Sequence, residues 1–395
     1  MTRHCGFLIA ALLLAFAFAP TQAALVQRIQ QVTNDVTSTP LGIAVDPLGS
    51  GGLYIADAGK FRVKLVATAP FSVNSPVPSS IATYAGTGKI GSTGDGGPAT
   101  LAELAYPTSV TVDLSGNVYI CDLDNNRVRM VSTVSNVRKI STVAGSGGEG
   151  KYGGDGGPAT LASLNSPYSV AVDGSGNMYV SDRDSHRVRY VNPATGLIST
   201  VVGTGVAGTG GDGGAGTSAQ LSSPQGLALA ANLDLYIADT GNHRIRKYAF
   251  ATRLLTTVAG TGQPAFSGDG GLAVAAALSR PTSVAVATTG TADTVYIADL
   301  ANLRVRVVTG GVITTLAGYG TTGTTGDEGP ATAALLQYPV AVAVDSLTGA
   351  VYIADGGAIR RVVVVEQAAA STVQASADLR YLAALAAIVP IIAVG

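Results

Sequence analysis

Acidic and basic residues recur at one fixed spacing along this chain of 395 residues. Six aspartates each stand five residues before an arginine, with four turn-forming residues between them. A ring of such carboxylates could hold a cation, but an aspartate and an arginine that flank one turn can also pair across it. Six copies at one repeat position favour the second interpretation, because every repeat must close the same turn. The predicted turn clamps are Asp57 with Arg62, Asp122 with Arg127, Asp182 with Arg187, Asp239 with Arg244, Asp299 with Arg304, and Asp355 with Arg360.

A second set of aspartates lies in glycine-rich segments of the Gly-Asp-Gly-Gly type. Such a loop could bind Ca²⁺, but calcium takes 6–8 oxygen ligands and each loop offers one aspartate. We therefore expect these side chains to cap a short helix that follows the loop. The five residues are Asp95, Asp155, Asp212, Asp269 and Asp327.

Histidine is scarce, which bears on metal chemistry. Beyond residue 23 the chain contains only His186 and His243. A catalytic zinc site takes three protein ligands, most often histidines. No Gly-x-Ser-x-Gly elbow with a histidine partner is present either. The sequence therefore predicts no metal, no cofactor and no catalytic residue.

Positions at which the repeats disagree are the better candidates for ligand binding. The second and third repeats carry extra charge after their aspartate, at Asp124, Arg183, Asp184 and His186, and Tyr168 follows the nearby proline. Nothing in the repeat pattern requires these five residues. A charged turn is often only a solvated one, and that alternative stays open. A mostly acidic patch with an arginine and a tyrosine suits a basic protein surface or a sugar.

The elements that position these residues repeat every 57–67 residues. Each unit has four runs rich in Val, Ile, Thr and Tyr, separated by Gly, Asn and Asp, as expected of β-strands. A fixed period of this size with only β-type segments predicts an all-β fold, a six-bladed β-propeller of four-stranded blades. The last unit stops at its third strand. Residues 28–33 fit the missing fourth strand, so we expect an N-terminal strand to complete the last blade and close the ring.

The segment between the fourth strand of one unit and the first strand of the next is a long insert. It begins at the Gly-Asp-Gly-Gly loop, and a proline such as Pro98 can start a helix. We expect a loop with one or two helical turns. Because strands in a blade are antiparallel, the inserts and the turns after the aspartates share one face. Function tends to lie on loops held by a rigid scaffold, which favours this loop-rich face.

The repeated patterns Pro-x-x-Val-Ala-Val-Asp, Tyr-Ile-Ala-Asp-x-x-Asn-x-Arg-Val-Arg and Thr-Val-Ala-Gly resemble the NHL repeat. The Gly-Asp-Gly-Gly-Pro-Ala-Thr insert is similar to the long NHL variety of extracellular and surface proteins, including the teneurin propeller. The resemblance covers residues 28–365, about six repeats. It implies the propeller fold, and a function as a protein- or RNA-binding platform, a sensor domain or, in relatives, an enzyme.

The two ends of the chain have a different character. Residues 1–23 read as a secretory signal peptide, and residues 24–365 form the predicted propeller, in which Cys121 is expected to be a small buried residue. An Ala/Ser/Thr-rich spacer, 366–380, precedes a hydrophobic tail, 381–395, which fits a GPI-attachment signal or a membrane anchor. We expect an extracellular protein, anchored at the cell surface through this tail.

Net charge and composition narrow the function classes. A net charge of −1 gives no basic surface for nucleic acid. We predict a non-catalytic binding scaffold for an unidentified protein or glycan. The alternatives are a propeller enzyme of the lactonase-like or strictosidine-synthase-like type, which would need inward acids or metal ligands, and a purely structural surface protein.

Overall fold

The computed structural model describes residues 25–33, 39–49, 52–67, 80–134 and 137–366. Within them Arg28–Val363 forms one compact unit. The predicted signal peptide, the hydrophobic tail and all but the first residue of the spacer lie outside the described residues. No described helix has the length and apolar character needed to cross a membrane.

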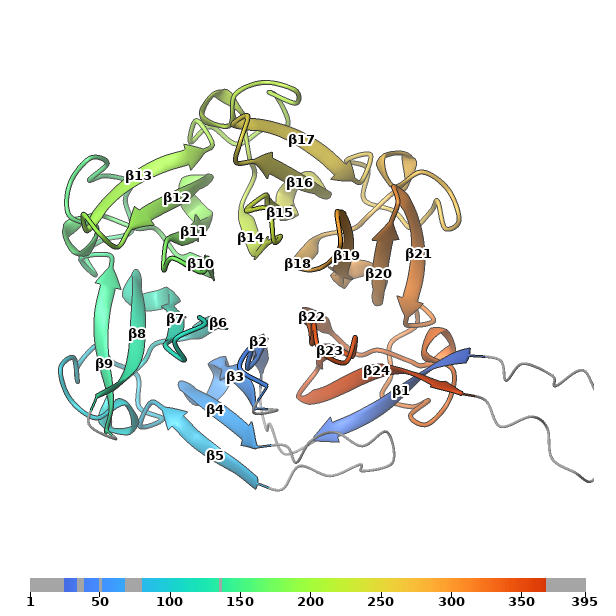
Figure 1. The fold of residues 1–395 in the computed structure, drawn as a ribbon, viewed down its shortest axis with the longest axis horizontal. Helices are drawn as coiled ribbons and strands as arrows, with labels where there is room; N and C mark the ends of the chain where they lie inside the picture. The colour runs from blue at the N-terminus through green and yellow to red at the C-terminus, as the bar shows by residue number, and fades with distance from the viewer. Residues whose placement is uncertain (1–24, 34–38, 50–51, 68–79, 135–136, 367–395) are drawn as a thin grey trace, which may run out of the picture. The chain divides into compact units, whose positions relative to one another are not determined.

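Six sheets of four antiparallel strands stand in a ring around a central axis (Figure 1). The fold class is therefore the predicted one, an all-β six-bladed propeller. In the first five blades the strands follow chain order from the axis outwards. In the sixth blade the order is β22-β23-β24-β1, so its outer strand comes from the start of the chain.

The strands of the first three blades are β2 (Pro40–Val45), β3 (Leu53–Asp57), β4 (Arg62–Ala67), β5 (Ser80–Ala85), β6 (Pro107–Val112), β7 (Val118–Asp122), β8 (Arg127–Val134), β9 (Val137–Ala144), β10 (Pro167–Val172), β11 (Met178–Asp182), β12 (Arg187–Asn192) and β13 (Leu197–Val202). Those of the last three blades are β14 (Pro224–Leu229), β15 (Leu235–Asp239), β16 (Arg244–Ala249), β17 (Leu254–Ala259), β18 (Pro281–Thr289), β19 (Ala292–Asp299), β20 (Arg304–Thr309), β21 (Val312–Ala317), β22 (Pro339–Val344), β23 (Val351–Asp355), β24 (Ala358–Glu366) and β1 (Leu25–Thr33).

The inserts are less helical than the sequence indicates. Each contains a single three-residue 3₁₀ turn that follows a residue in extended or near-extended backbone, such as Pro98. A glycine before this turn packs against the alanine after it, since a Cβ on Gly94 would lie 2.6 Å from the Ala102 Cα. The insert turns are η2 (Ala99–Leu101), η4 (Ala159–Leu161), η6 (Gly216–Ser218), η8 (Ala273–Ala275) and η10 (Ala331–Ala333); those between second and third strands are η1 (Ala58–Lys60), η3 (Leu123–Asn125), η5 (Arg183–Ser185), η7 (Thr240–Asn242) and η9 (Leu300–Asn302).

The core lies between the blades. The second strands β3, β7, β11, β15 and β23 are buried along their whole length, and apolar residues such as Ile120 and Ile237 are fully buried. One cluster joins Tyr54 and Val63 of the first blade to Val118 of the second. Cys121 is also fully buried, as predicted for a small core residue. Each blade thus buries its apolar faces against its neighbours.

Candidate functional site

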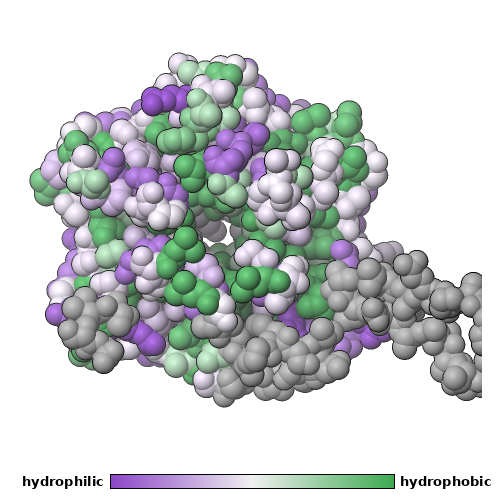
Figure 2. All heavy atoms as spheres, in the orientation of Figure 1, coloured by the Kyte–Doolittle hydropathy of each residue, from purple (hydrophilic) through white to green (hydrophobic). Residues whose placement is uncertain are grey.

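The six inner strands enclose a channel on the propeller axis, with a volume of about 260 Å³. Figure 2 shows the opening at the centre of the ring, with hydrophobic surface beside it. The described lining residues are aliphatic residues, glycines, Ser, Thr and Tyr168, with no Asp, Glu, His or Cys among them. The channel wall therefore offers a ligand hydroxyl groups and apolar contacts rather than ionised groups.

Hydroxyl groups of the inner strands tie neighbouring blades together. Thr108 Oγ1 donates to the Tyr168 carbonyl oxygen at 2.7 Å, and Thr282 Oγ1 donates to the Val340 carbonyl at 2.8 Å. Elsewhere the strands approach even more closely, since a Cβ on Gly42 would lie 2.6 Å from the Ser109 Cα. The inner ring is thus a close-packed frame, and its mouth is held in place by these contacts.

Aromatic and basic side chains gather at the mouth on the insert face. Each inner strand begins at a proline where the insert ends, so the residues beside that proline lie at this mouth. Tyr106, Tyr338, Arg183 and Arg280 are all near enough to the Tyr168 hydroxyl to affect its pKa, which burial raises to about 12. Tyr106 and Tyr338 are 36% and 50% exposed. The mouth is therefore a tyrosine-lined rim with two guanidinium groups.

Four of the five predicted binding residues come together here. Arg183 Nε and Nη2 donate to the two carboxylate oxygens of Asp184 at 2.8 and 2.9 Å. Its guanidinium carbon lies 5.9 Å from the centre of the Tyr168 ring. The Asp184 hydrogen bond raises the pKa of Arg183, and Asp124 adds a smaller effect in the same direction. Burial raises the pKa of Asp184, but hydrogen bonds from Arg183 and Ser166 and the nearby positive charge together outweigh it, and the pKa is lowered.

The fifth predicted residue, His186, faces the next blade. It has a left-handed backbone with φ 53°, and its Nδ1 accepts a hydrogen bond from the Ser223 N–H at 3.0 Å. His243 accepts in the same way from the Arg280 N–H at 2.9 Å. In the second blade Asn126 fills the equivalent position. The two histidines therefore act as hydrogen-bond acceptors that join consecutive blades.

The aspartates that end the second strands have partners other than the predicted ones in five blades. Asp122 Oδ2 lies 3.6 Å from Arg129 Nη1, seven residues on, while Arg127 Nη2 donates to the Ser146 carbonyl. The spacing differs because the turn length differs. Strand register places Arg129 opposite Ile120. In the sixth blade, where the turn is shorter, Arg360 takes the equivalent position opposite Ile353.

These ion pairs join the following residues: Asp57 with Lys64, Asp122 with Arg129, Asp182 with Arg189, Asp239 with Arg246, Asp299 with Arg306, and Asp355 with Arg360. The pairs predicted for Arg62, Arg127, Arg187, Arg244 and Arg304 are corrected accordingly. Each of these five arginines donates instead to a backbone carbonyl of the following insert.

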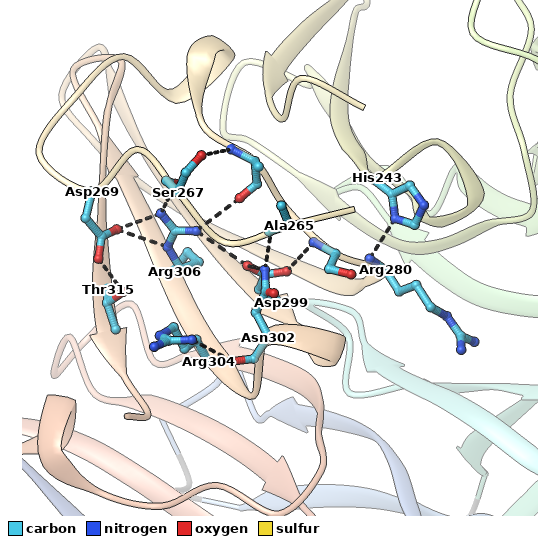
Figure 3. A network of polar contacts seen from close by, with 12 residues as sticks. His243, Ala265, Ser267, Asp269, Arg280, Asp299, Asn302, Arg304, Arg306 and Thr315 are labelled. Atoms are coloured by element: carbon cyan, nitrogen blue, oxygen red, sulfur yellow. Dashed lines mark hydrogen bonds and ion pairs between the residues drawn. The ribbon is translucent and has the colours of Figure 1, made fainter. Parts of the chain in front are cut away.

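The insert aspartates bind the same buried arginines, which corrects the expected helix cap. Asp269 Oδ1 accepts from Arg306 Nη2 at 2.6 Å, and its Oδ2 accepts from Thr315 Oγ1 at 2.6 Å. Arg306 thus lies between Asp269 and Asp299 (Figure 3). None of the insert turns has a side-chain cap. Blades two to six all carry this acid–arginine–acid network, through Asp95, Asp155, Asp212, Asp269 and Asp327.

One guanidinium shared by two carboxylates leaves one negative charge uncompensated. The pKa of Asp122, Asp239 and Asp299 is raised to about 6. Burial is the largest cause of this rise, and hydrogen bonds from asparagine, backbone and arginine oppose it only in part. At Asp95 the opposite effect wins. Hydrogen bonds from Thr142 and Arg129 outweigh burial, and the pKa is lowered. In the second and third blades the inner acid, Asp122 or Asp182, is therefore a weaker acid than the insert aspartate, Asp95 or Asp155.

Metal chemistry has no candidate ligand set in the described part of the chain. No three His, Cys, Asp or Glu side chains there are arranged to hold an ion. Burial and the neighbouring Asp122 raise the pKa of the Cys121 thiol well above its usual value, so this cysteine remains protonated.

Sequence reasoning missed Tyr106, Arg280 and Tyr338. All three stand immediately before the proline that opens an inner strand, and the repeats differ there as they do after the proline. Arg280 and Tyr106 also have left-handed backbones. A comparison of this position across the six repeats would have found them.

The NHL repeat family model matches residues 221–248. NHL repeat-containing protein 2 of Gallus gallus is 35% identical over 106 residues, 27% of this chain and 14% of that protein. Human Teneurin-4 is 29% identical over 309 residues, 67% of this chain and 10% of that protein. This chain is an NHL-repeat β-propeller. It spans only about a tenth of the length of these relatives.

Solved structures show the same propeller fold at low identity. An auxiliary nutrient binding protein from Bacteroides thetaiotaomicron has a TM-score of 0.59 and 15% identity, covering 87% of this NHL propeller and 77% of that chain. A gluconolactonase from Xanthomonas campestris has a TM-score of 0.51 and 14% identity, covering 89% and 93%. These similarities concern the fold alone.

Proposed function

We propose that this NHL propeller is a non-catalytic binding scaffold that recognises a protein or glycan through the channel mouth on its insert face. The observation that carries the proposal is the cluster around Tyr168, in which Tyr106, Tyr338, Arg183 and Arg280 converge at one opening. The repeat pattern requires none of these side chains. Side chains that differ from those at the same position in the other repeats, and that the fold does not require, are candidates for ligand binding.

The chemistry of the mouth suggests the ligand class. Tyrosine rings offer an apolar face and a polar edge, which suits the face of a sugar or an aliphatic side chain. Arg183 and Arg280 can bind carboxylates through paired hydrogen bonds, and the exposed Asp124 and Asp184 can accept from hydroxyl or amino groups. A glycan or a mixed-charge protein loop meets all of these requirements.

The full chain, displayed on glycan and ectodomain arrays, provides the test. For any ligand found, Tyr168→Ala and Arg183→Ala should each weaken binding about tenfold or more, which corresponds to about 1.4 kcal/mol. The control is Glu149→Ala with Lys151→Ala, which removes a largely exposed ion pair elsewhere on the insert face. Equal loss in the control, or hydrolysis of lactones by the same preparation, would contradict the proposal.

Secretion and surface attachment form part of the same proposal and rest on the character of residues 1–23 and 366–395. A GPI-attached protein should be released from cells by phosphatidylinositol-specific phospholipase C. Mass spectrometry that finds Gly395 on the mature protein would contradict GPI attachment.

A further inference from the structure

Two inserts place an aromatic ring on the arginine that begins the third strand of a blade. In the third blade the Arg187 guanidinium carbon lies 3.6 Å from the centre of the Tyr152 ring. In the fifth blade Arg304 lies at the same distance from the centre of the Phe266 ring. Each aromatic residue stands three residues before the insert aspartate. This position of the insert can therefore supply a ring that stacks on the arginine.

The phenol of Tyr152 makes contacts at its edge as well as at its face. Its hydroxyl donates to Asp155 Oδ2 at 2.8 Å and lies 3.4 Å from Thr200 Oγ1. The arginine thus contacts the face of the ring, and the insert aspartate accepts from its hydroxyl. The third blade therefore shows how an arginine, an aspartate and a threonine of this fold hold a phenol.

The fourth blade has the same three groups around an open pocket. The pocket has a volume of about 610 Å³, and Arg244, Asp212 and Thr257 line it. These residues correspond to the arginine, aspartate and threonine around Tyr152 in the third blade. Three residues before the insert aspartate the fourth blade has Thr209, which is exposed. The place that a tyrosine takes in the third blade is therefore accessible to a ligand in the fourth.

Arg244 is held in the same way as the arginine that carries the tyrosine ring. Its Nη2 donates to the Thr261 carbonyl at 2.9 Å, as Arg187 Nη2 donates to the Thr204 carbonyl at 2.6 Å. One face of the guanidinium packs on Gly262, since a Cβ there would lie 3.0, 3.1 and 3.2 Å from Nη2, Cζ and Nε. A ring that enters the pocket can therefore stack on Arg244 without reorienting it.

The pocket also has an apolar residue at a position where the other described insert turns are polar. Val274 lines the pocket from the insert that follows the fourth blade and is 50% exposed. It is the middle residue of its 3₁₀ turn, and an occupant of the pocket can bury it, which favours an aromatic ring. The middle residues of the other four insert turns are Thr100, Thr160, Thr217 and Thr332.

We propose that this pocket of the fourth blade binds a tyrosine side chain of a partner protein. The ring stacks on Arg244 and contacts Val274. Its hydroxyl donates to Asp212, whose carboxylate has lone pairs for both the phenol and the Thr257 hydroxyl. A volume of about 610 Å³ is in the range of pockets for drug-sized ligands, so it also accommodates residues that flank the tyrosine in the partner.

The pocket is separate from the channel mouth. It lies against β17, the outer strand of the fourth blade (Figure 1), and it shares no described lining residue with the channel. The proposal therefore does not depend on the function proposed for the mouth.

A peptide of the chain's own tyrosine-bearing insert, Glu-Gly-Lys-Tyr-Gly-Gly (residues 149–154), is the probe. It should bind the full chain saturably in a saturation-transfer NMR titration. A copy with phenylalanine in place of tyrosine should bind several-fold more weakly, because it cannot donate to Asp212. The small phenol p-cresol, which lacks flanking residues, should also bind several-fold more weakly. A peptide that does not bind would overturn the proposal, and p-cresol that binds as well as the peptide would make the ligand a free phenol instead of a partner protein.

Two variants locate the binding at this pocket. Arg244→Ala should weaken peptide binding about tenfold, whereas Arg127→Ala removes the equivalent arginine of the second blade and should leave binding unchanged. Thr209→Tyr supplies the ring from the chain's own insert, so it should block the peptide and raise the Tm by about one to two degrees. Thr209→Ala is its control and should change neither.

The same variants can contradict the proposal. Peptide binding that survives Thr209→Tyr would place the peptide elsewhere on the surface, and equal losses in Arg244→Ala and Arg127→Ala would do the same. If Arg244→Ala instead dissolves a concentration-dependent dimer, the occupant is a tyrosine of a second copy of the chain and the proposed partner is wrong.

Discussion

The outer network and the channel mouth of this propeller differ in how they use charge. In blades two to six an arginine is buried between two aspartates, with nearly the same partners each time. At the mouth, the charges and rings come from a few blades only, and Arg183, Arg280, Asp124 and Asp184 are at least partly exposed. Arginine and aspartate therefore form a repeated buried network in one region and a cluster that only a few blades carry in the other.

The difference shows which charges the fold requires. A buried guanidinium holds the insert, the second strand and the third strand of one blade together, and each blade needs that connection. An exposed pair such as Arg183 with Asp184 joins only two adjacent residues of one turn. Charges of the network should therefore determine stability, and charges of the mouth should determine recognition.

The largest effect is expected from Arg306→Met. This change leaves Asp299 buried without its cation and also releases Asp269, which holds Thr315. Removal of one partner of a buried ion pair costs about 3–5 kcal/mol. Urea unfolding of the full chain measures the loss.

Arg304→Met is the matched control, two residues earlier on the same strand. Arg304 is partly exposed and donates to the carbonyls of Asn302 and Tyr319, so its loss should cost about 1 kcal/mol. Arg306→Lys should fall between the two. Equal losses of stability in Arg304→Met and Arg306→Met would show that the buried network stabilises the fold no more than a partly exposed arginine does.

The sequence was sufficient to predict the propeller. Period, strand composition and prolines each indicate the same six units, and residues such as Ile120 and Cys121 are buried as their apolar, small-residue pattern indicates. Because the same pattern recurs in every repeat, each repeat supports the strand assignment of the others. The fold class and the residues of the core could therefore be predicted from the sequence.

The ion-pair partners could not be predicted from spacing. Arg127 and Arg129 lie on the same side of their strand, and only the register and the nearby insert decide which of them reaches Asp122. The insert aspartates are 33–37 residues away from their arginines along the chain, and Asp95 lies 34 residues from Arg129. The mouth is equally non-local, since Tyr106, Tyr168 and Tyr338 converge from three blades.

The network should also give a distinctive pH dependence. The folded pKa of Asp122, Asp239 and Asp299 is about 6, above the usual value of about 3.9 in unfolded chains. Protonation therefore favours the folded state, and stability should rise as the pH falls from 7 towards about 4. The pKa of Asp95 and Asp155 is lowered, so further acidification should remove their contribution.

Thermal melts between pH 8 and pH 3 measure this dependence. A Tm that is higher by a few degrees near pH 5 than at pH 7, and then falls below about pH 4, is the expected profile. A Tm that declines steadily from pH 7 would mean that the inner aspartates are fully compensated by their arginines. The size of the effect should lie below that of Arg306→Met, because protonation leaves every hydrogen-bonded side chain in place.

The smallest effect on stability is expected at the mouth. Arg183→Ala with Asp184→Ala removes an ion pair whose side chains are 26% and 40% exposed. Exposed pairs contribute about 0–1 kcal/mol, and Asp184 keeps its backbone hydrogen bond to the Asn165 carbonyl after substitution. The Tm should stay within about two degrees of the wild type, while binding at the mouth is lost. A loss of stability comparable to that of Arg306→Met would make these charges part of the folding framework. In that case the asymmetry between the blades would reflect packing of the third blade against the second, and the mouth would lose its claim to be a recognition surface.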